Sequence, residues 1–322
     1  MTQRRRQRGV ALLAAMLTVT LVATLASAAL WQQWRSVEIE SAERARMQDA
    51  WILTGALDWA RLILREDART GGADDLTEPW SVPLAESRLS TFLAAGGSEA
   101  AAADGADDGA AETYLAGRIT DLQSRLNVNN LVDGTIVSDT ALRTFARLYG
   151  LLNLPVSELQ QVAENLRFAA DTSADNRSGG LAPLKPQRLP ELAWLGMSPS
   201  SLKLLEPYIT LLPARTPINL NTAPAEVIYA AVAGLDMAGA QRLVAQRERV
   251  PFRNLQDANR LIAGSELSAE LHAVATRYFE VRGLLRTARG AIEESSLLQR
   301  DGMDVRILRR ERLPPPELVL PR

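Results

Sequence analysis

The sequence contains no cysteine and a single histidine, His272, among its 322 residues. Without cysteine the chain has neither a disulfide framework nor a thiolate metal site, a composition that the periplasm permits. It has no glycine-rich phosphate loop, no HExxH-type metal site and no set of residues suited to acid–base chemistry together. His272 is expected to be a partly buried or surface residue. These absences argue against an enzyme.

Basic residues are also too few to favour binding of nucleic acid. Residues 1–9 hold four of the 36 lysines and arginines, which leaves 32 basic against 38 acidic residues, a net charge of −6. Such a chain has no general attraction for phosphate backbones. Its length leaves room for a sizeable core and about two soluble units.

Charge is absent from one long stretch, Val10 to Trp34, which follows Arg4-Arg5-Arg6-Gln7-Arg8-Gly9. A membrane-spanning helix needs roughly 20 apolar residues, so this stretch is long enough to cross a bilayer. The arginines are expected to stay in the cytoplasm, with the rest of the chain across the membrane. Three interpretations remain open: a secretory signal cleaved near Leu25–Ala29, a simple anchor, and a type IV prepilin leader that is cut after Gly9.

The helix is expected to continue beyond the apolar stretch, because residues 37–66 contain no proline and one glycine. Five residues at spacings of three or four predict one stripe that packs in a core: Met47, Trp51, Gly55, Trp59 and Leu62. Gly71-Gly72 is expected to end the helix. A helix that first spans a bilayer and then packs on a soluble domain resembles the type IV pilin design.

The remainder predicts an α+β fold. Segments rich in Ile, Val, Leu and aromatic residues predict strands over 113–121, 277–285, 290–299 and 305–312. The pattern between the first and second of these is helical, with Ser138, Ser157 and Ser198-Pro199 as candidate helix starts. Two stretches, 71–83 and 98–111, are expected to be poorly ordered, the second because it is too poor in apolar residues to offset its ordering entropy. The expected architecture is a long N-terminal helix on a small antiparallel sheet, with a large inserted helical domain.

Four motifs together resemble the K-type minor pseudopilin of the type II (general) secretion pathway, the GspK family. The first is Gly9 followed by Val10-Ala11-Leu12-Leu13-Ala14, in which Ala14 stands where most pilins have glutamate. The resemblance implies cleavage after Gly9, methylation of the Val10 amine and a place at the filament tip. A carboxylate at that position is thought to pair with the terminal amine of a neighbouring subunit, and a tip subunit has no such neighbour ahead of it.

The second and third motifs contain most of the polar residues that the resemblance singles out. The second is Gly117–Leu131, and the third combines Leu189-Pro190-Glu191-Leu192 with Ile218–Pro224. The three asparagines of the second motif are interpreted as turn formers, since asparagine bonds its own backbone. In the third motif, Thr222 is interpreted as the cap of a helix whose first turn accepts Pro224. The residues concerned are Asn127, Asn129, Asn130, Asn219, Asn221 and Thr222.

The fourth motif is a helix-hairpin-helix pattern, in which segments 227–232 and 240–248 flank a turn that contains Gly234. DNA-binding modules share this pattern, so a membrane-anchored DNA-binding or uptake protein is the alternative. In those modules the hairpin glycines let backbone N–H groups approach phosphate, whereas here Asp236 replaces the second glycine and adds negative charge. Helix packing is therefore the preferred interpretation, and the insert is expected to be helix-hairpin-helix or SAM-like.

Calcium is the one cofactor that the resemblance implies, because family members hold it in acidic loops. Asp171, Asp175 and Asn176 precede Gly179-Gly180 and supply the oxygen ligands that calcium prefers. The family usually continues with Gly-Ala-Glu-Asp, and here Leu181-Ala182-Pro183 follows. The alternative is a solvated loop without metal.

The resemblance implies a structural subunit of the inner membrane that supports export of folded proteins. Its expected partners are the I-, J- and H-type minor pseudopilins, the prepilin peptidase, the inner-membrane assembly platform and exoproteins. No nucleic acid is expected. The expected parts are a leader (1–9), a transmembrane helix (10–34), its periplasmic continuation (35–70), a β-domain (71–124 and 276–312), the helical insert (125–275) and a tail (313–322).

Overall fold

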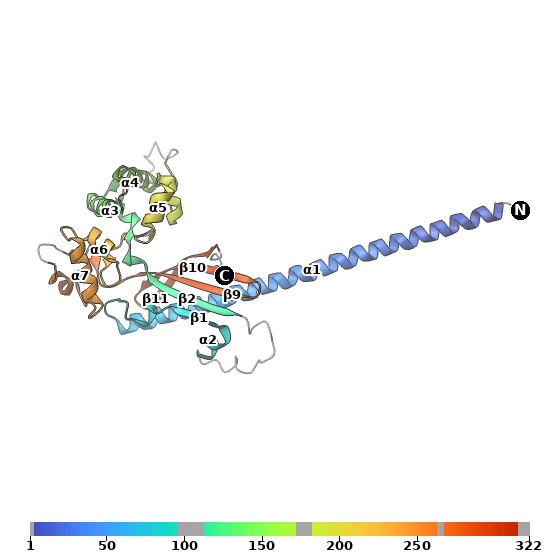
Figure 1. Ribbon diagram of the computed structural model, residues 1–322, viewed down its shortest axis with the longest axis horizontal. Coiled ribbons are helices and arrows are strands. Elements are labelled where there is room, and N and C mark those ends of the chain that lie inside the picture. Colours follow the sequence, from blue (N-terminus) through green and yellow to red (C-terminus); the bar gives the residue numbers. More distant parts are fainter. Residues whose placement is uncertain (1–2, 96–112, 172–181, 263–266, 315–322) are drawn as a thin grey trace. The chain divides into compact units, whose positions relative to one another are not determined.

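The computed structural model describes residues 3–95, 113–171, 182–262 and 267–314, with the side chains of 3–9 and 93–95 left out. The chain divides into two compact units, Met1–Gly55 and Ala56–Arg322. One helix, α1 (Gln3–Thr70), runs from the first unit into the second (Figure 1). Helix α1 ends immediately before Gly71 and Gly72, both at positive φ, as the sequence predicts.

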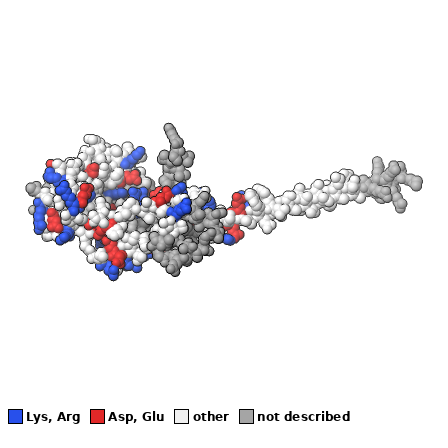
Figure 2. Space-filling model, turned by 60° about the horizontal axis from the view of Figure 1, so that its bottom comes forward, with Lys and Arg blue, Asp and Glu red and all other residues white. Residues whose placement is uncertain are grey.

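The first unit is the N-terminal part of α1, and its apolar residues face outward. The stretch from Val10 is long and apolar enough to cross a membrane, and none of its most hydrophobic window is buried. Figure 2 shows this stretch as uncharged up to a band of acidic and basic side chains, which lies within residues 35–46. A bilayer or partner helices would therefore have to cover these side chains in the cell.

The second unit contains an antiparallel sheet of five strands in the order β1-β2-β9-β10-β11. Strands β9 to β11 form a meander. The Gly302-Met303 turn between the last two has Gly302 at φ 57°, as tight hairpins require. The predicted strands are confirmed, whereas β1 and the short helix α2 were not predicted. Their bounds are β1 Leu84–Arg88, α2 Leu89–Ala95, β2 Tyr114–Asp121, β9 Tyr278–Thr287, β10 Gly290–Asp301 and β11 Asp304–Leu313.

Residues 57–64 of α1 form a core with one face of the sheet. Leu57, Ala60 and Leu64 are buried, and they pack in one cluster with residues such as Phe279 and Leu298. Trp80 joins this cluster, with its ring edge-on to Phe279 at 5.3 Å between centroids. Aromatic pairs in this geometry add stabilisation beyond their buried area.

The predicted core stripe along α1 is wrong. Met47, Trp51, Trp59 and Leu62 are each at least 45% exposed, and Gly55 is exposed too. Helix α1 carries a second apolar series, Leu57, Ala60 and Leu64, and this series meets the sheet. Periodicity identifies apolar faces but does not say which one is buried when a helix has two.

The expectation of poor order over residues 71–83 is also wrong. Asp74 is 3% exposed and Trp80, in the short 3-10 helix η1 (Pro79–Ser81), is 2% exposed. Asp74 binds Arg300 and Thr276, and Trp80 packs on Phe279. These partners are distant in the sequence, so the local composition of residues 71–83 does not reveal them. The other such stretch, 98–111, lies outside the described residues.

Between β2 and β9 the chain builds a helical region with its own core, whose buried members run from Leu126 to Ile262. Ser138 and Ser198 cap their helices as predicted, but Ser157 does not, because α4 begins at Val156 with Pro155 before it. The helices are α3 Asp139–Leu151, α4 Val156–Ala170, α5 Pro199–Leu205, α6 Ala225–Ala231, α7 Met237–Arg247 and α8 Leu255–Asn259.

Short strand pairs and 3-10 helices connect these elements. The pairs are β3 (Leu126–Asn127) with β6 (Ile209–Thr210), β4 (Val132–Asp133) with β5 (Ile136–Val137), and β7 (Ile218–Asn219) with β8 (His272–Ala273). The 3-10 helices are η4 Leu122–Ser124, η5 Val128–Leu131 and η7 Leu189–Leu195. The architecture is therefore α+β, as predicted.

The two faces of α1 predict different costs for the same substitution. Leu64→Ala removes a fully buried side chain and should lower the free energy of unfolding by about 2–5 kcal/mol. Leu62→Ala, two residues away and 52% exposed, should change it by less than about 0.5 kcal/mol. Urea unfolding of the full chain in detergent micelles measures both, and equal losses would contradict this assignment of the buried face.

Candidate functional site

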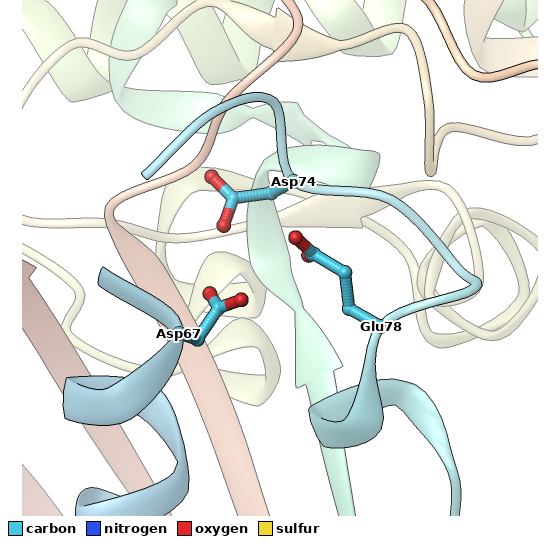
Figure 3. Close-up of side chains that lie close together, drawn as sticks. All are labelled: Asp67, Asp74 and Glu78. Carbon is cyan, nitrogen blue, oxygen red and sulfur yellow. The ribbon is translucent and has the colours of Figure 1, made fainter. Parts of the chain in front are cut away.

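Three carboxylates lie close together at the C-terminal end of α1 (Figure 3). Asp67 lies in the last turn of the helix, Asp74 in the following loop and Glu78 immediately before η1, and their nearest oxygens lie within 4.8 Å of one another. Among the residues that the structure describes, these three form the group of side chains that could together hold a metal ion. Sequence reasoning missed them because they fall in or beside the stretch that was expected to be poorly ordered.

A cation of the chain itself already occupies this cluster. The Arg300 guanidinium from β10 donates to both Asp67 and Asp74, and it also donates to the Thr276 carbonyl oxygen at 3.1 Å. The Thr276 backbone N–H donates to the second oxygen of Asp74 at 2.6 Å. Both ion pairs are about nine-tenths buried, so removal of one partner would leave an uncompensated charge in the interior. The arrangement fits a structural lock between α1 and β10.

Glu78 is the member of the cluster that Arg300 does not reach. Burial raises its pKa to about 7, and the Asp67 and Asp74 charges add to the rise. The Trp80 indole N–H, at 2.6 Å from its carboxylate, and the Asp75 backbone N–H, at 3.1 Å, act against the rise. Burial also raises the pKa of Asp74, against the effect of the Arg300 charge. The raised pKa places the titration of Glu78 near neutral pH.

A second buried carboxylate, Asp121, joins the sheet to the helical region. It ends β2, is 2% exposed, and accepts hydrogen bonds from the Thr222 hydroxyl at 2.6 Å, the Asn219 amide at 3.0 Å and the Gln123 backbone N–H at 2.7 Å. Burial raises its pKa, and these bonds oppose the rise. Asn219 also donates to the Asp74 carbonyl oxygen at 3.0 Å. Through Asn219 the two carboxylate sites are parts of one buried network, which we call the polar junction: Asp67, Asp74, Glu78, Asp121, Asn219, Thr222 and Arg300.

The asparagines of the second motif make the predicted turn and also join distant segments. Asn127 accepts from the Asn129 backbone N–H at 3.1 Å, which is the expected local bond. It also accepts from the Leu212 N–H at 3.1 Å and donates to the Ala214 carbonyl at 2.7 Å. Asn130 exchanges two hydrogen bonds with the backbone of Thr216. These long-range bonds fix the entry of the helical region against residues 212–216, and the sequence contains no sign of them.

The asparagines of the third motif also make a local bond and long-range bonds, and the cap predicted at Thr222 is wrong. Asn219 accepts from the Asn221 N–H at 3.0 Å, and the Asn221 side chain exchanges two hydrogen bonds with the backbone of Phe252, each at 2.9 Å. Thr222 does not cap a helix, because α6 begins at Ala225 with Pro224 before it. Its hydroxyl instead donates to Asp121, a stronger acceptor that lies 101 residues away in sequence.

The hairpin between α6 and α7 has the turn geometry that its glycine predicts, with Gly234 at φ 78°. The Asp236 carboxylate accepts from the Gly239 N–H at 2.7 Å and so takes up a donor at the start of α7. Arg147 from α3 donates to the Val232 and Leu235 carbonyls of the turn. The hairpin is thus bound to α3, and a carboxylate stands where a phosphate would bind.

The remaining predicted residues lie apart from the polar junction. Gly9, Val10 and Ala14 are in the N-terminal part of α1, where Val10 and Ala14 are exposed. Asp171 follows the last residue of α4, whereas Asp175 and Asn176 lie outside the described residues. His272 is 2% exposed in β8 and close to the carbonyl oxygens of Ser268 and Ala231, so it is more buried than expected.

Comparisons with known proteins agree on one family. Two family models, both described as type II secretion system protein K, match residues 124–214 and 218–281. A type II secretion system protein K of Pseudomonas aeruginosa is 28% identical, over 86% of this chain and 84% of its own length. That of Pectobacterium carotovorum subsp. carotovorum is 26% identical, over 96% of this chain and 97% of its own length.

The fold is similar to that of a chain in the crystal structure of the GspK-GspI-GspJ complex from the type 2 secretion system of enterotoxigenic Escherichia coli. The TM-score is 0.58 at 17% identity, and the likeness covers 85% of this chain and 98% of the other. None of these relatives favours the DNA-binding alternative.

The raised pKa of Glu78 predicts a pH dependence of stability. Between its ordinary value of 4.5 and about 7 the folded protein holds more protons than the unfolded chain, so Glu78 lowers the free energy of unfolding as pH rises through this range. Glu78→Gln keeps an acceptor for Trp80 but carries no charge. It should therefore raise stability at pH 8 by on the order of 1 kcal/mol, with screening by solvent allowed for, and leave it little changed at pH 4.

Thermal unfolding of both proteins across pH 4–8 tests this prediction. Glu66→Gln serves as the control, because Glu66 is exposed and precedes Asp67 in the last turns of α1. A constant difference between Glu78→Gln and wild type at every pH would contradict the assignment.

Proposed function

Because the chain belongs to the type II secretion system protein K family, we propose that it is a minor pseudopilin of that system. The proposed sequence of events begins with cleavage after Gly9 by the prepilin peptidase and methylation of the Val10 amine. The helix from Val10 then holds the subunit in the inner membrane, with the N-terminus in the cytoplasm and the soluble region in the periplasm. The subunit has a structural role there, and no catalytic one is proposed.

The single observation that carries the proposal is the division of α1. Its first part has no charge from Val10 to Trp34 and is exposed, while residues 57–64 are built into the core of the sheet. A cleavable secretory signal would be lost from the mature protein, and nothing would require its helix to continue into a folded domain. A helix that serves both as membrane span and as core suits a subunit whose anchor also enters a bundle of helices.

We place the subunit at the tip of the periplasmic pseudopilus, where it initiates or caps assembly. Ala14 supports this position, since a tip subunit has no neighbour ahead whose terminal amine would need a carboxylate. The helical region of residues 125–275 supports it too, because so large an insert would clash within a filament of small subunits. The filament would in turn support the export of folded proteins across the outer membrane.

We propose the other minor pseudopilins, of the I, J and H types, as partners. The related complex joins GspK to GspI and GspJ. In this chain Met47 and Trp51 are 59% and 76% exposed on α1, beyond the membrane-spanning stretch. Large apolar side chains of this kind are typical of the centres of protein interfaces. Small residues in the membrane stretch, including Ala14, Ala15 and Thr18, allow close approach of partner helices.

Co-purification tests the proposed assembly. The full chain, expressed with the I- and J-type pseudopilins of the same secretion system and extracted in mild detergent, should retain both. Met47→Asp should reduce their recovery by about tenfold, because it places a charge in the proposed contact. Met303→Asp makes the same change at a residue that is 47% exposed in the hairpin turn between β10 and β11, and it should have no effect. Failure of wild type to retain either pseudopilin would overturn the proposal.

A further inference from the structure

The sheet has a second face, opposite to the one that packs on α1. Because Phe279 and Val281 point toward α1, the residues between and beyond them point away from it. The strand register aligns two rows of side chains across this second face. They are Thr120, Glu280, Leu297 and Arg309 in one row, and Arg118, Arg282, Ser295 and Glu311 in the other.

A groove of about 560 Å³ lies where this face meets the segments before η7 and after β6. Its apolar lining comes from Leu211, Leu212, Leu297 and Leu308, and Leu308 is 42% exposed. A second hollow of about 440 Å³ adjoins it and shares three of its residues, Lys185, Gln187 and Arg309. The second hollow adds two exposed apolar side chains, Leu184 at 72% and Trp194 at 50%.

Both acids that line the second hollow are already paired within the chain. Glu191 binds Arg188 at 2.7 Å and two backbone N–H groups, and Glu311 binds Arg309. Arg309 also donates to the Gln187 carbonyl, which holds the segment against β11. Lys185 has no ion-pair partner within the part of the chain that the structure describes. A carboxylate of a partner protein could form an ion pair with Lys185.

The two rows of the second face place two arginines, Arg118 and Arg282, beside a single acid, Glu280. Arg118 and Arg282 stand directly opposite each other on β2 and β9, and like charges in this position destabilise a strand pair. Burial lowers the pKa of Arg125, and the Arg282 and Arg118 charges lower it further, against Glu280 and Glu206. Glu280 is shared between Arg282 at 3.1 Å and the Ser295 hydroxyl at 2.8 Å, so it does not neutralise Arg118.

We propose that this face docks an extended, acidic segment of a partner protein, with apolar side chains in the groove and carboxylates on Lys185 and on the Arg118–Arg282 pair. An extended chain sends every second side chain to one side, so a single segment can present both kinds of group to one face of a sheet. A second copy of this face would bring arginine against arginine and is disfavoured. The docking surface shares no residue with the pseudopilin contact proposed at Met47 and Trp51, so each can be altered without changing the other's side chains.

The probe for this surface is a fluorescent eight-residue peptide of alternating Glu and Val, with an alternating Lys and Val peptide as its counterpart. Anisotropy with the full chain in non-ionic micelles, corrected for micelles alone, should show binding of the acidic peptide only. Lys185→Glu and Arg118→Glu should each weaken that binding by about tenfold, and binding should fall as salt rises. Arg260→Glu is the matched control, since Arg260 is an exposed residue that follows α8 in the helical region and lines neither hollow.

Reversal of the charge at Lys185, tested with the acidic and the basic peptide, distinguishes direct contact with the peptide from loss of folding. If Lys185 touches the ligand, Lys185→Glu should gain affinity for the basic peptide while its thermal unfolding stays unchanged. Equal binding of both peptides by wild type, or equal losses in Lys185→Glu and Arg260→Glu, would overturn the proposal. So would self-association of the full chain that Lys185→Glu abolishes, because the occupant would then be a second copy.

Discussion

The packing of residues 57–64 of α1 on the sheet is the interaction on which the rest of the second unit depends. Without Leu57 and Leu64, the sheet would expose Phe279, Val281 and Leu298 to water, and each buried apolar side chain of this size contributes about 1.5–3 kcal/mol. The same helix continues N-terminally into a stretch that is suited to a bilayer rather than to water. Any force on the apolar N-terminal part of α1 would therefore act on a helix that is built into the core of a folded domain.

The polar junction fixes the path of the chain beyond this packed helix. It brings together the end of α1, the end of β2 and the strands β7 and β10, and its members are nearly all buried and hydrogen-bonded. Buried polar groups of this kind contribute little net stability when satisfied, but each one that loses its partner is costly. The network therefore specifies one arrangement of the sheet and the adjoining helical region. For a subunit proposed to stand at the tip of a filament, a fixed geometry at this point sets where the helical region is presented.

Sequence reasoning succeeded where structure is determined locally. The strands β2, β9, β10 and β11, the end of α1 and the caps Ser138 and Ser198 follow from alternation, glycine and capping chemistry. It failed where a distant partner decides. Asp74 is held by Arg300, which lies 226 residues away in the sequence, and Trp80 is held by Phe279. Thr222 binds Asp121 instead of capping α6. Of the polar junction, the resemblance singles out Asn219 and Thr222, whereas nothing local in the sequence indicates the carboxylates and Arg300 that complete it.

The claim that α1 begins as a processed pilin-type helix is tested most directly by the mass of the mature N-terminus. In a strain with the type II secretion system, the account predicts a chain that begins at Val10 with a methylated amine. It also predicts that Gly9→Ala stays uncut, while Gly55→Ala, whose added methyl group meets no atom within 4 Å, is cut like wild type. A wild-type chain that keeps residues 1–9, or one cut near Ala28, would contradict the account.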